Sequence, residues 1–173
     1  MATWTIDTAH SEIGFKVKHL VISTASGKFT SFEGTVEAEK DDFTDAKISF
    51  SADISSIHTG QEQRDAHLKS ADFFDAENFP KLTFTSTSVE KSGDDYKITG
   101  DLTLKGVTKS IVVNAEFGGI EKSLYGQIVA GFEVTTKINR QDYGLTWSAV
   151  TEAGGLVVAN DVKLIANVEL IKQ

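Results

Sequence analysis

The feature that most constrains the fold of this chain is an alternation of apolar and polar side chains along most of its 173 residues. From Ser11 to His19, the side chains of Ile13, Phe15 and Val17 share one face, and lysines and a glutamate occupy the other. A period of two is typical of an antiparallel strand with one buried and one hydrated face. The same alternation predicts these further inner rows: Phe32, Gly34, Val36, Ala38; Ala46, Ile48, Phe50, Ala52, Ile54; Leu82, Phe84, Ser86, Ser88; Ile98, Gly100, Leu102, Leu104; Ile111, Val113, Ala115, Phe117; Leu124, Gly126, Ile128, Ala130, Phe132, Val134, Ile138; Val158, Val162, Leu164, Ala166, Val168, Leu170.

The length and spacing of these rows favour a β-barrel or sandwich over βαβ units. Turn residues, including Ser92 to Asp95 and Gly118-Gly119, separate the strands at short intervals. The strands run to about 9–14 residues against a usual ~5–6, as the tilted strands of a barrel require. We therefore predict an all-β fold, an antiparallel barrel of about eight strands. Small inner residues such as Gly34, Gly100 and Ala130 either leave room for an internal cavity or relieve strand curvature and taper.

Residues 53–84 form the one long segment that breaks the alternation. Thr59 and Glu62 fit a capping box, which predicts a short helix from about residue 60 to 68. Ser70 fits an N-cap for a second turn, and Pro80 favours an extended chain before the next strand. We expect a helical insertion around residues 60–75 that lies across one opening of the barrel. The alternative is a surface crossover without function.

Composition and charge exclude several classes of protein. The net charge of −8, with no run of Lys or Arg, argues against binding to nucleic acid. The absence of cysteine excludes disulfides and thiolate metal sites, and no apolar run approaches the ~20 residues of a transmembrane helix. No signal peptide is recognisable, so we expect a cytoplasmic protein, or a periplasmic one if the sequence is a recloned mature form. The length predicts one domain spanning residues 1–173.

The polar residues give weak indications of chemistry. The four histidines lack metal-binding spacing, so we expect no metal site and a structural role for each of them. No nucleophile-elbow, dinucleotide or P-loop motif is present, and a non-enzymatic protein is predicted. A dyad of Asp65 and His67 with Arg64 remains as the alternative, an enzyme acting on a small amphipathic substrate.

The two arginines, Arg64 and Arg140, stand in the two most irregular segments of the chain. Each has an acid close by, which favours bidentate ion pairs. Two interpretations carry equal weight at this point. The arginines grip a phosphate or other anionic head group at the barrel mouth, or they fasten the helix and the loop to the barrel.

Several ordered motifs make the chain resemble the YceI-like, polyisoprenoid-binding family. The matching stretches are W-T-I-D-x-x-H-S-x-I-x-F-x-V-x-H-L from Trp4, S-I-x-T from Ser56, R-D-x-H-L from Arg64, F-F-D from Phe73, F-P from Phe79, G-D-L-T-L-K-G-V-T-K from Gly100, I-N-R-x-D-Y-G-L from Ile138, and V-x-L-x-A-x-V-E from Val162. The resemblance covers essentially the whole chain. It implies a lipocalin-like barrel with a long apolar pore that holds a polyisoprenoid or another long-chain lipid, and frequent dimerisation.

Together these observations predict a non-enzymatic carrier or store for a long-chain lipid, with no other cofactor. The donor or acceptor partner is not indicated, and a stress-response interaction protein with an incidental cavity remains a further alternative. The predicted pore lining comprises Phe15, Val17, Val36, Ile48, Phe50, Phe84, Leu102, Ile128 and Phe132. Phe73, Phe74 and Trp147 are predicted to cover the mouth, with Arg64, His67 and Arg140 near a head group.

Overall fold

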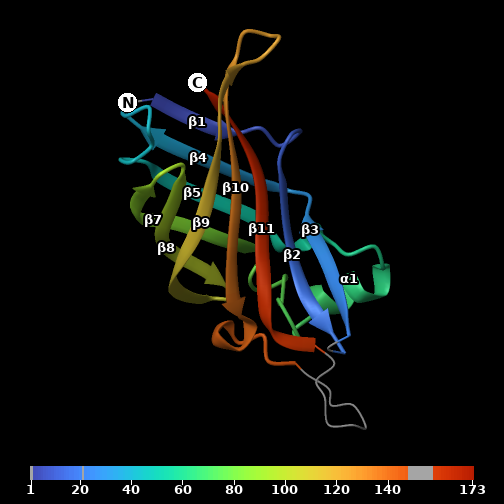
Figure 1. Cartoon of the computed structure of the whole chain (residues 1–173). Coiled ribbons are helices and arrows are strands. Elements are labelled where there is room, and N and C mark those ends of the chain that lie inside the picture. Colours follow the sequence, from blue (N-terminus) through green and yellow to red (C-terminus); the bar gives the residue numbers. More distant parts are fainter. Residues whose placement is uncertain (1, 21, 148–157) are drawn as a thin grey trace.

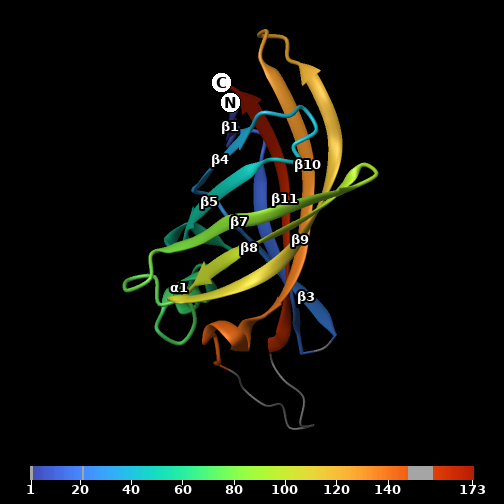
Figure 2. The same cartoon turned by 90° about the vertical axis from the view of Figure 1, so that its left-hand side faces the viewer.

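The computed structural model describes residues 2–20, 22–147 and 158–173. Eight antiparallel strands form a closed barrel, in which every strand pairs with its neighbours and β1 closes the ring against β11 (Figures 1 and 2). In order around the ring they are β1 (Ala2–Ile6), β4 (Phe32–Ala38), β5 (Lys47–Asp53), β7 (Lys81–Ser92), β8 (Asp95–Leu104), β9 (Val107–Lys122), β10 (Ile128–Asn139) and β11 (Val158–Lys172). The predicted all-β barrel of about eight strands is confirmed.

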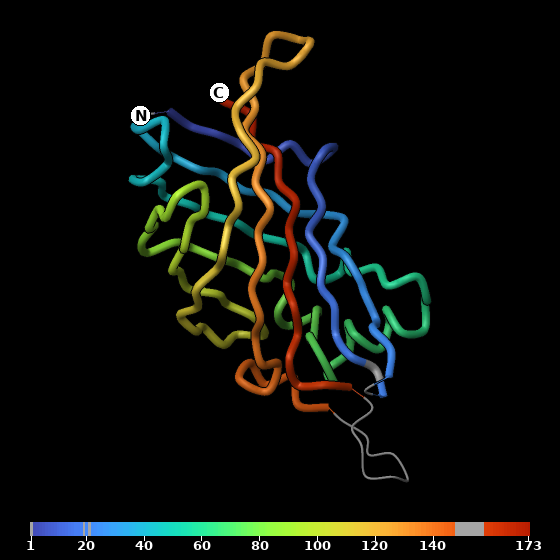
Figure 3. The backbone as a smooth tube through the Cα atoms, viewed as in Figure 1, coloured from blue at the N-terminus to red at the C-terminus, as the bar shows by residue number. Residues whose placement is uncertain are grey.

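The long strand β11 pairs with β10 along one edge and with two different strands along the other. Its last residues pair with β1, so the two termini lie close together at one end of the barrel (Figure 3). Its first part pairs with β2 (Glu12–His19), which continues the sheet to β3 (Ser23–Phe29) and the short β6 (Ile57–His58). These three strands extend the barrel wall at the opposite end.

The predicted alternation of faces holds along β4 and β5. In β4 the side chains of Phe32, Val36 and Ala38 turn inward, and the intervening glutamates and threonine are more exposed. Ile48 of β5 lies opposite Val36 in the ladder. Because such pairs share one face, they build a continuous apolar lining from strand to strand.

Two β-bulges interrupt the regular ladders, and the first of them moves residues from their predicted faces. A register shift between Ser86 and Ser88 turns Ser88 outward and brings Val89 inward, because an extra residue reverses the alternation. Gly118-Gly119 is not a turn, as β9 continues to Lys122 with a register shift opposite Gly131.

The hairpin of β9 and β10 therefore extends past the barrel and turns at residues 123–126 (Figure 2). Leu124, predicted to face inward, is fully exposed at this tip, and Ile128 is 40% exposed. Gly126, from the same predicted inner row, has a φ of +82° and belongs to the turn. The inner row of β10 begins only at Ala130, which is completely buried.

The helical insertion is present with different capping. It contains the 3₁₀ turn η1 (Ile54–Ser56), β6 and the helix α1 (Glu62–Lys69), followed by turns that lead to Pro80 and β7. Gln61 occupies the N-cap position without a side-chain hydrogen bond, so the predicted capping box is wrong. The predicted turn from Ser70 is present, because the carbonyl of Ser70 accepts from the N–H of Phe73. The Ser70 hydroxyl does not cap this turn but donates to the carbonyl of His67 at the C-terminus of α1.

Aromatic rings occupy part of the space above the inner glycines. The ring of Phe84 packs over Gly100, and a Cβ there would collide with it and with the carbonyl of Thr85. A Cβ on Gly34 would likewise meet Ile6 and the ring of Phe50. These two glycines therefore make room for neighbouring side chains, which limits the free volume of the barrel.

Candidate functional site

An apolar cavity of about 210 Å³ runs inside the barrel between its two core clusters. None of the lining residues that the structure describes carries a charge. The polar residues of the lining are Thr35, Ser49, Tyr96 and Thr136, of which Thr35 and Ser49 have exposed side chains on the outer faces of β4 and β5. Six predicted lining residues are found there: Val36, Ile48, Phe50, Phe84, Leu102 and Phe132. A small apolar solute or a segment of hydrocarbon chain matches this surface, because such a cavity offers dispersion contacts and few hydrogen bonds.

Three predicted lining residues lie elsewhere. The ring of Phe15 packs 5.9 Å from that of Phe29 and lines a separate groove at the barrel wall. Val17 is half-buried opposite Val162, away from the cavity lining. Ile128 lies near the exposed hairpin tip, because β9 continues to Lys122 and the chain turns only at residues 123–126.

The cavity is closed at one end by Phe43, which the sequence reading did not single out. Phe43 is buried and lies in the loop between β4 and β5, where its φ of +60° is in the left-handed region. Its ring meets that of Phe132 edge-on at 5.4 Å and that of Trp4 at 5.3 Å. The loop is held by the Tyr96 hydroxyl, which donates to the carbonyl of Asp42 at 2.5 Å. The sequence feature that could have identified Phe43 as a core residue is its position as a single phenylalanine among acidic turn residues.

At the other end, the insertion and the β10–β11 connection bring aromatic rings together. His67 of α1, Phe73 and Trp147 form a triad with ring centroids 5.0–5.2 Å apart. Phe74 packs edge-on against Phe29, a cavity-lining residue, at 6.5 Å. Phe73 belongs to the core cluster at this end, and Phe74 and Trp147 pack against it. None of the three is in the cavity lining, so their role at a mouth stays a prediction.

Arg64 and Asp65 organise the start of α1 through Thr59. Both the backbone N–H and the hydroxyl of Thr59 donate to Asp65 Oδ1, at 2.9 and 2.5 Å. Arg64 donates from Nε to the Thr59 hydroxyl and from Nη2 to its carbonyl, at 2.8 and 2.6 Å. His67 instead pairs with Asp72 at 3.0 Å, so Asp65 and His67 form no dyad.

Arg140 is 3% exposed, and burial lowers the pKa of its guanidinium. It begins the 3₁₀ turn η2 (Arg140–Tyr143) and donates to four backbone carbonyls. These belong to Leu145, Trp147, Val158 and Ala159, at 2.5–3.2 Å. The predicted ion pairs between each arginine and a neighbouring acid are wrong: no arginine pairs with an acid across residues 2–20, 22–147 and 158–173. Arg140 fastens the β10–β11 connection to the barrel.

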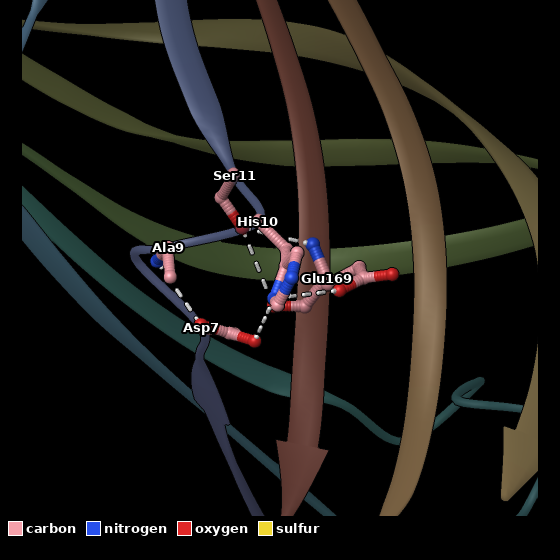
Figure 4. A network of polar contacts seen from close by, with 5 residues as sticks. All are labelled: Asp7, Ala9, His10, Ser11 and Glu169. Carbon is pink, nitrogen blue, oxygen red and sulfur yellow. Dashed lines mark hydrogen bonds and ion pairs between the residues drawn. The ribbon is translucent and has the colours of Figure 1, made fainter. Parts of the chain in front are cut away.

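A third polar cluster joins the β1–β2 turn to β11 on the outside of the barrel (Figure 4). His10 Nδ1 lies 2.6 Å from Asp7 Oδ2 and 3.6 Å from Glu169 Oε2. The hydrogen bond to Asp7 raises the pKa of His10, and the same bond lowers the pKa of Asp7. One potential metal-ligand atom from each residue lies within 4.8 Å of the others. The hydrogen bond between His10 and Asp7, with Glu169 close by, joins the β1–β2 turn to β11.

Comparison with known proteins agrees with the geometry. The family model of the YceI-like domain matches residues 4–170. The chain belongs to the YceI-like family. It is 41% identical to UPF0312 protein SAS2572 of Staphylococcus aureus (strain MSSA476) over 170 residues, which cover 98% of this chain and 97% of that protein.

Solved structures show the same YceI-like barrel. The YceI protein of Campylobacter jejuni is 35% identical, with a TM-score of 0.76 and 96% of each chain covered. A polyisoprenoid-binding domain from Saccharophagus degradans gives a TM-score of 0.70 over 98% of each chain, at 16% identity. The second likeness shows the fold alone. No helix among the described residues of this YceI-like protein has both the length and the apolar character needed to span a bilayer.

Proposed function

We propose that this YceI-like protein binds the chain of a polyisoprenoid or similar long lipid inside its barrel, and carries or stores it without catalysis. The observation that carries the proposal is the closed barrel enclosing a cavity without a charged residue in its described lining. The name of the Saccharophagus degradans relative supports an isoprenoid as the first cargo to test.

The energetics favour a chain ligand over a compact polar one. Burial of each CH₂ group contributes ~0.8 kcal/mol, so a twenty-carbon chain gains up to about 16 kcal/mol before ordering costs are subtracted. Ligand cavities usually measure ~300–1,000 Å³, and this one measures about 210 Å³. A long chain therefore needs side chains at the cavity to move, and the rings of Phe43, Phe50 and Phe84 occupy the space it would take.

The arrangement of polar groups gives less support to the rival enzyme. Asp65 is engaged by Thr59, and His67 is turned toward Asp72 and the aromatic triad. General acid–base catalysis needs such groups within hydrogen-bond reach of one reacting atom. Among the described residues, no charged side chain lines the cavity. Binding of an apolar chain, by contrast, requires no charged side chain in the cavity.

Native mass spectrometry of the purified protein, followed by organic extraction and lipid analysis, tests the proposal. We expect a stoichiometric long-chain lipid in the wild type. Ala166→Phe adds a ring at a cavity-lining position and should abolish loading, whereas Asn167→Phe places the same ring on the outer face and should not. Circular dichroism confirms that both variants fold. Equal lipid content in the two variants would contradict binding in this cavity.

A further inference from the structure

Tyr143 carries a buried hydroxyl without a hydrogen-bond partner among the described residues. The residue closes η2, directly after β10, and its side chain is 2% exposed. Tyr96, the buried tyrosine near the Phe43 end of the barrel, differs in that its hydroxyl donates to the carbonyl of Asp42. A buried hydroxyl that donates to nothing is unfavourable, and few native proteins retain one without a reason.

The Tyr143 hydroxyl is kept as a neutral donor. Burial, with a smaller contribution from Asp142, raises the pKa of this phenol, so it remains protonated at neutral pH. A protonated phenol offers one O–H to an acceptor and carries no charge. It suits an uncharged oxygen acceptor in apolar surroundings better than it suits a phosphate, whose burial would require compensating cations.

The two arginines are engaged within the fold. Arg140 directs Nε, Nη1 and Nη2 at four backbone carbonyls, two in the β10–β11 connection and two at the start of β11. Arg64 directs Nε and Nη2 at Thr59. An anionic head group would have to displace these bonds to reach a guanidinium, whereas an acceptor at Tyr143 displaces none.

We propose that the Tyr143 hydroxyl is the hydrogen-bond donor for an uncharged head group, such as an alcohol, ketone or amide, on the cargo chain. This inference rests on the proposed lipid-binding function. Tyr143 shares a core cluster with the cavity-lining residues Phe29, Leu82 and Leu102, so the head group lies at the η2 end. The tail then points toward Phe43. Tyr143 stands behind the cavity lining, and the side-chain movement that admits a long chain also exposes its hydroxyl.

Three probes with one twenty-carbon isoprenoid chain test the proposal: geranylgeraniol, geranylgeranyl phosphate and the matching oxygen-free hydrocarbon. Their affinities are measured by native mass spectrometry titration for the wild type, Tyr143→Phe and the control Tyr125→Phe, which makes the same change at the exposed hairpin tip. We expect the wild type to bind the alcohol roughly fivefold more tightly than the hydrocarbon, the gain of one neutral hydrogen bond. Tyr143→Phe should lose this preference, and Tyr125→Phe should keep it. The phosphate should bind no more tightly than the alcohol.

The outcomes separate this inference from the function on which it rests. If the wild type binds none of the probes, the proposed function fails. If all probes bind but Tyr143→Phe retains the preference for the alcohol, or the phosphate binds at least tenfold more tightly than the alcohol, only the head-group assignment is overturned. Thermal melting without probe gives a second readout. Tyr143→Phe should melt no lower than the wild type, and a clear decrease would show that the hydroxyl already has a partner in solution, against the proposal.

Discussion

Replacing Arg140 tests whether this arginine holds the fold or waits for a ligand. Arg140→Met removes four hydrogen bonds from a guanidinium to backbone carbonyls. Hydrogen bonds to charged groups contribute ~1.5–3 kcal/mol each, which sums to about 6–12 kcal/mol. Removing the buried cation recovers several kcal/mol of desolvation, so a net loss of about 3–5 kcal/mol is expected. For a chain of this length, that loss lowers Tm by roughly 6–20 °C.

The measurement is thermal unfolding followed by circular dichroism, with urea titration for the free energy of unfolding. Arg64→Met is the control, because Arg64 is only half-buried and both of its hydrogen bonds are made to Thr59, five residues away in the same local segment. We expect the control to lose about 1–2 kcal/mol. A Tm for Arg140→Met within about 2 °C of the wild type would refute the fastening role. In that case the alternative role, contact with a lipid head group, predicts that Arg140→Met loses lipid binding.

Three further predictions concern separate parts of the barrel. Because the pKa of His10 is raised, the stability that His10 contributes is complete below about pH 6.5 and is lost as the pH rises through its folded-state pKa. The pKa of Asp7 is lowered, so the contribution of Asp7 is lost only in acid. Urea titration should therefore show a larger loss of unfolding free energy for His10→Gln at about pH 5.5 than at about pH 9. Phe43→Gly should lower the free energy of unfolding by about 2–4 kcal/mol, because loss of the buried ring outweighs the relief of ~1 kcal/mol of left-handed backbone strain. Organic extraction of this variant should recover longer lipid chains than extraction of the wild type. Gly100→Ala should lower the free energy of unfolding by about 1–3 kcal/mol, because the added Cβ collides with the Phe84 ring and the Thr85 carbonyl. Gly131→Ala is the control: its added Cβ meets open space, so it should be neutral or slightly stabilising.

The sequence predicted the barrel well because alternation is a local property of each strand. Val36 and Ile48 were placed on the inner face from their own segments, and they meet across β4 and β5. The errors arise where the face depends on the partner strand. The extra residue between Ser86 and Ser88 changes which side chains of β7 face inward. A second bulge lies opposite Gly131, where β9 continues past its predicted end. Neither bulge can be recognised from the residue pattern of its own strand.

The site was less predictable than the fold. Arg140 was recognised as unusual, but residue type alone does not tell whether a guanidinium faces carbonyls of its own chain or a ligand. Thr59 was assigned to a capping box, yet its hydroxyl bonds to Asp65, a residue within the helix. Phe43 was missed because it lies in a turn, outside any periodic row, and its orientation comes from packing against Trp4 and Phe132.

Under the proposed function, the polar residues of the family motifs contribute little to the selection of a cargo. Arg140 fastens the β10–β11 connection and Asp65 organises the start of α1. An apolar wall holds any chain of suitable width, because the hydrophobic effect is non-directional. Discrimination between cargoes must then come from the two ends of the cavity. Under the proposed function, Phe43 at one end limits the length of chain that enters. The Tyr143 hydroxyl, which has no hydrogen-bond partner among the described residues, lies in the core cluster at the other end and would select the head group. The proposal thus assigns both selections to residues outside the alternating rows.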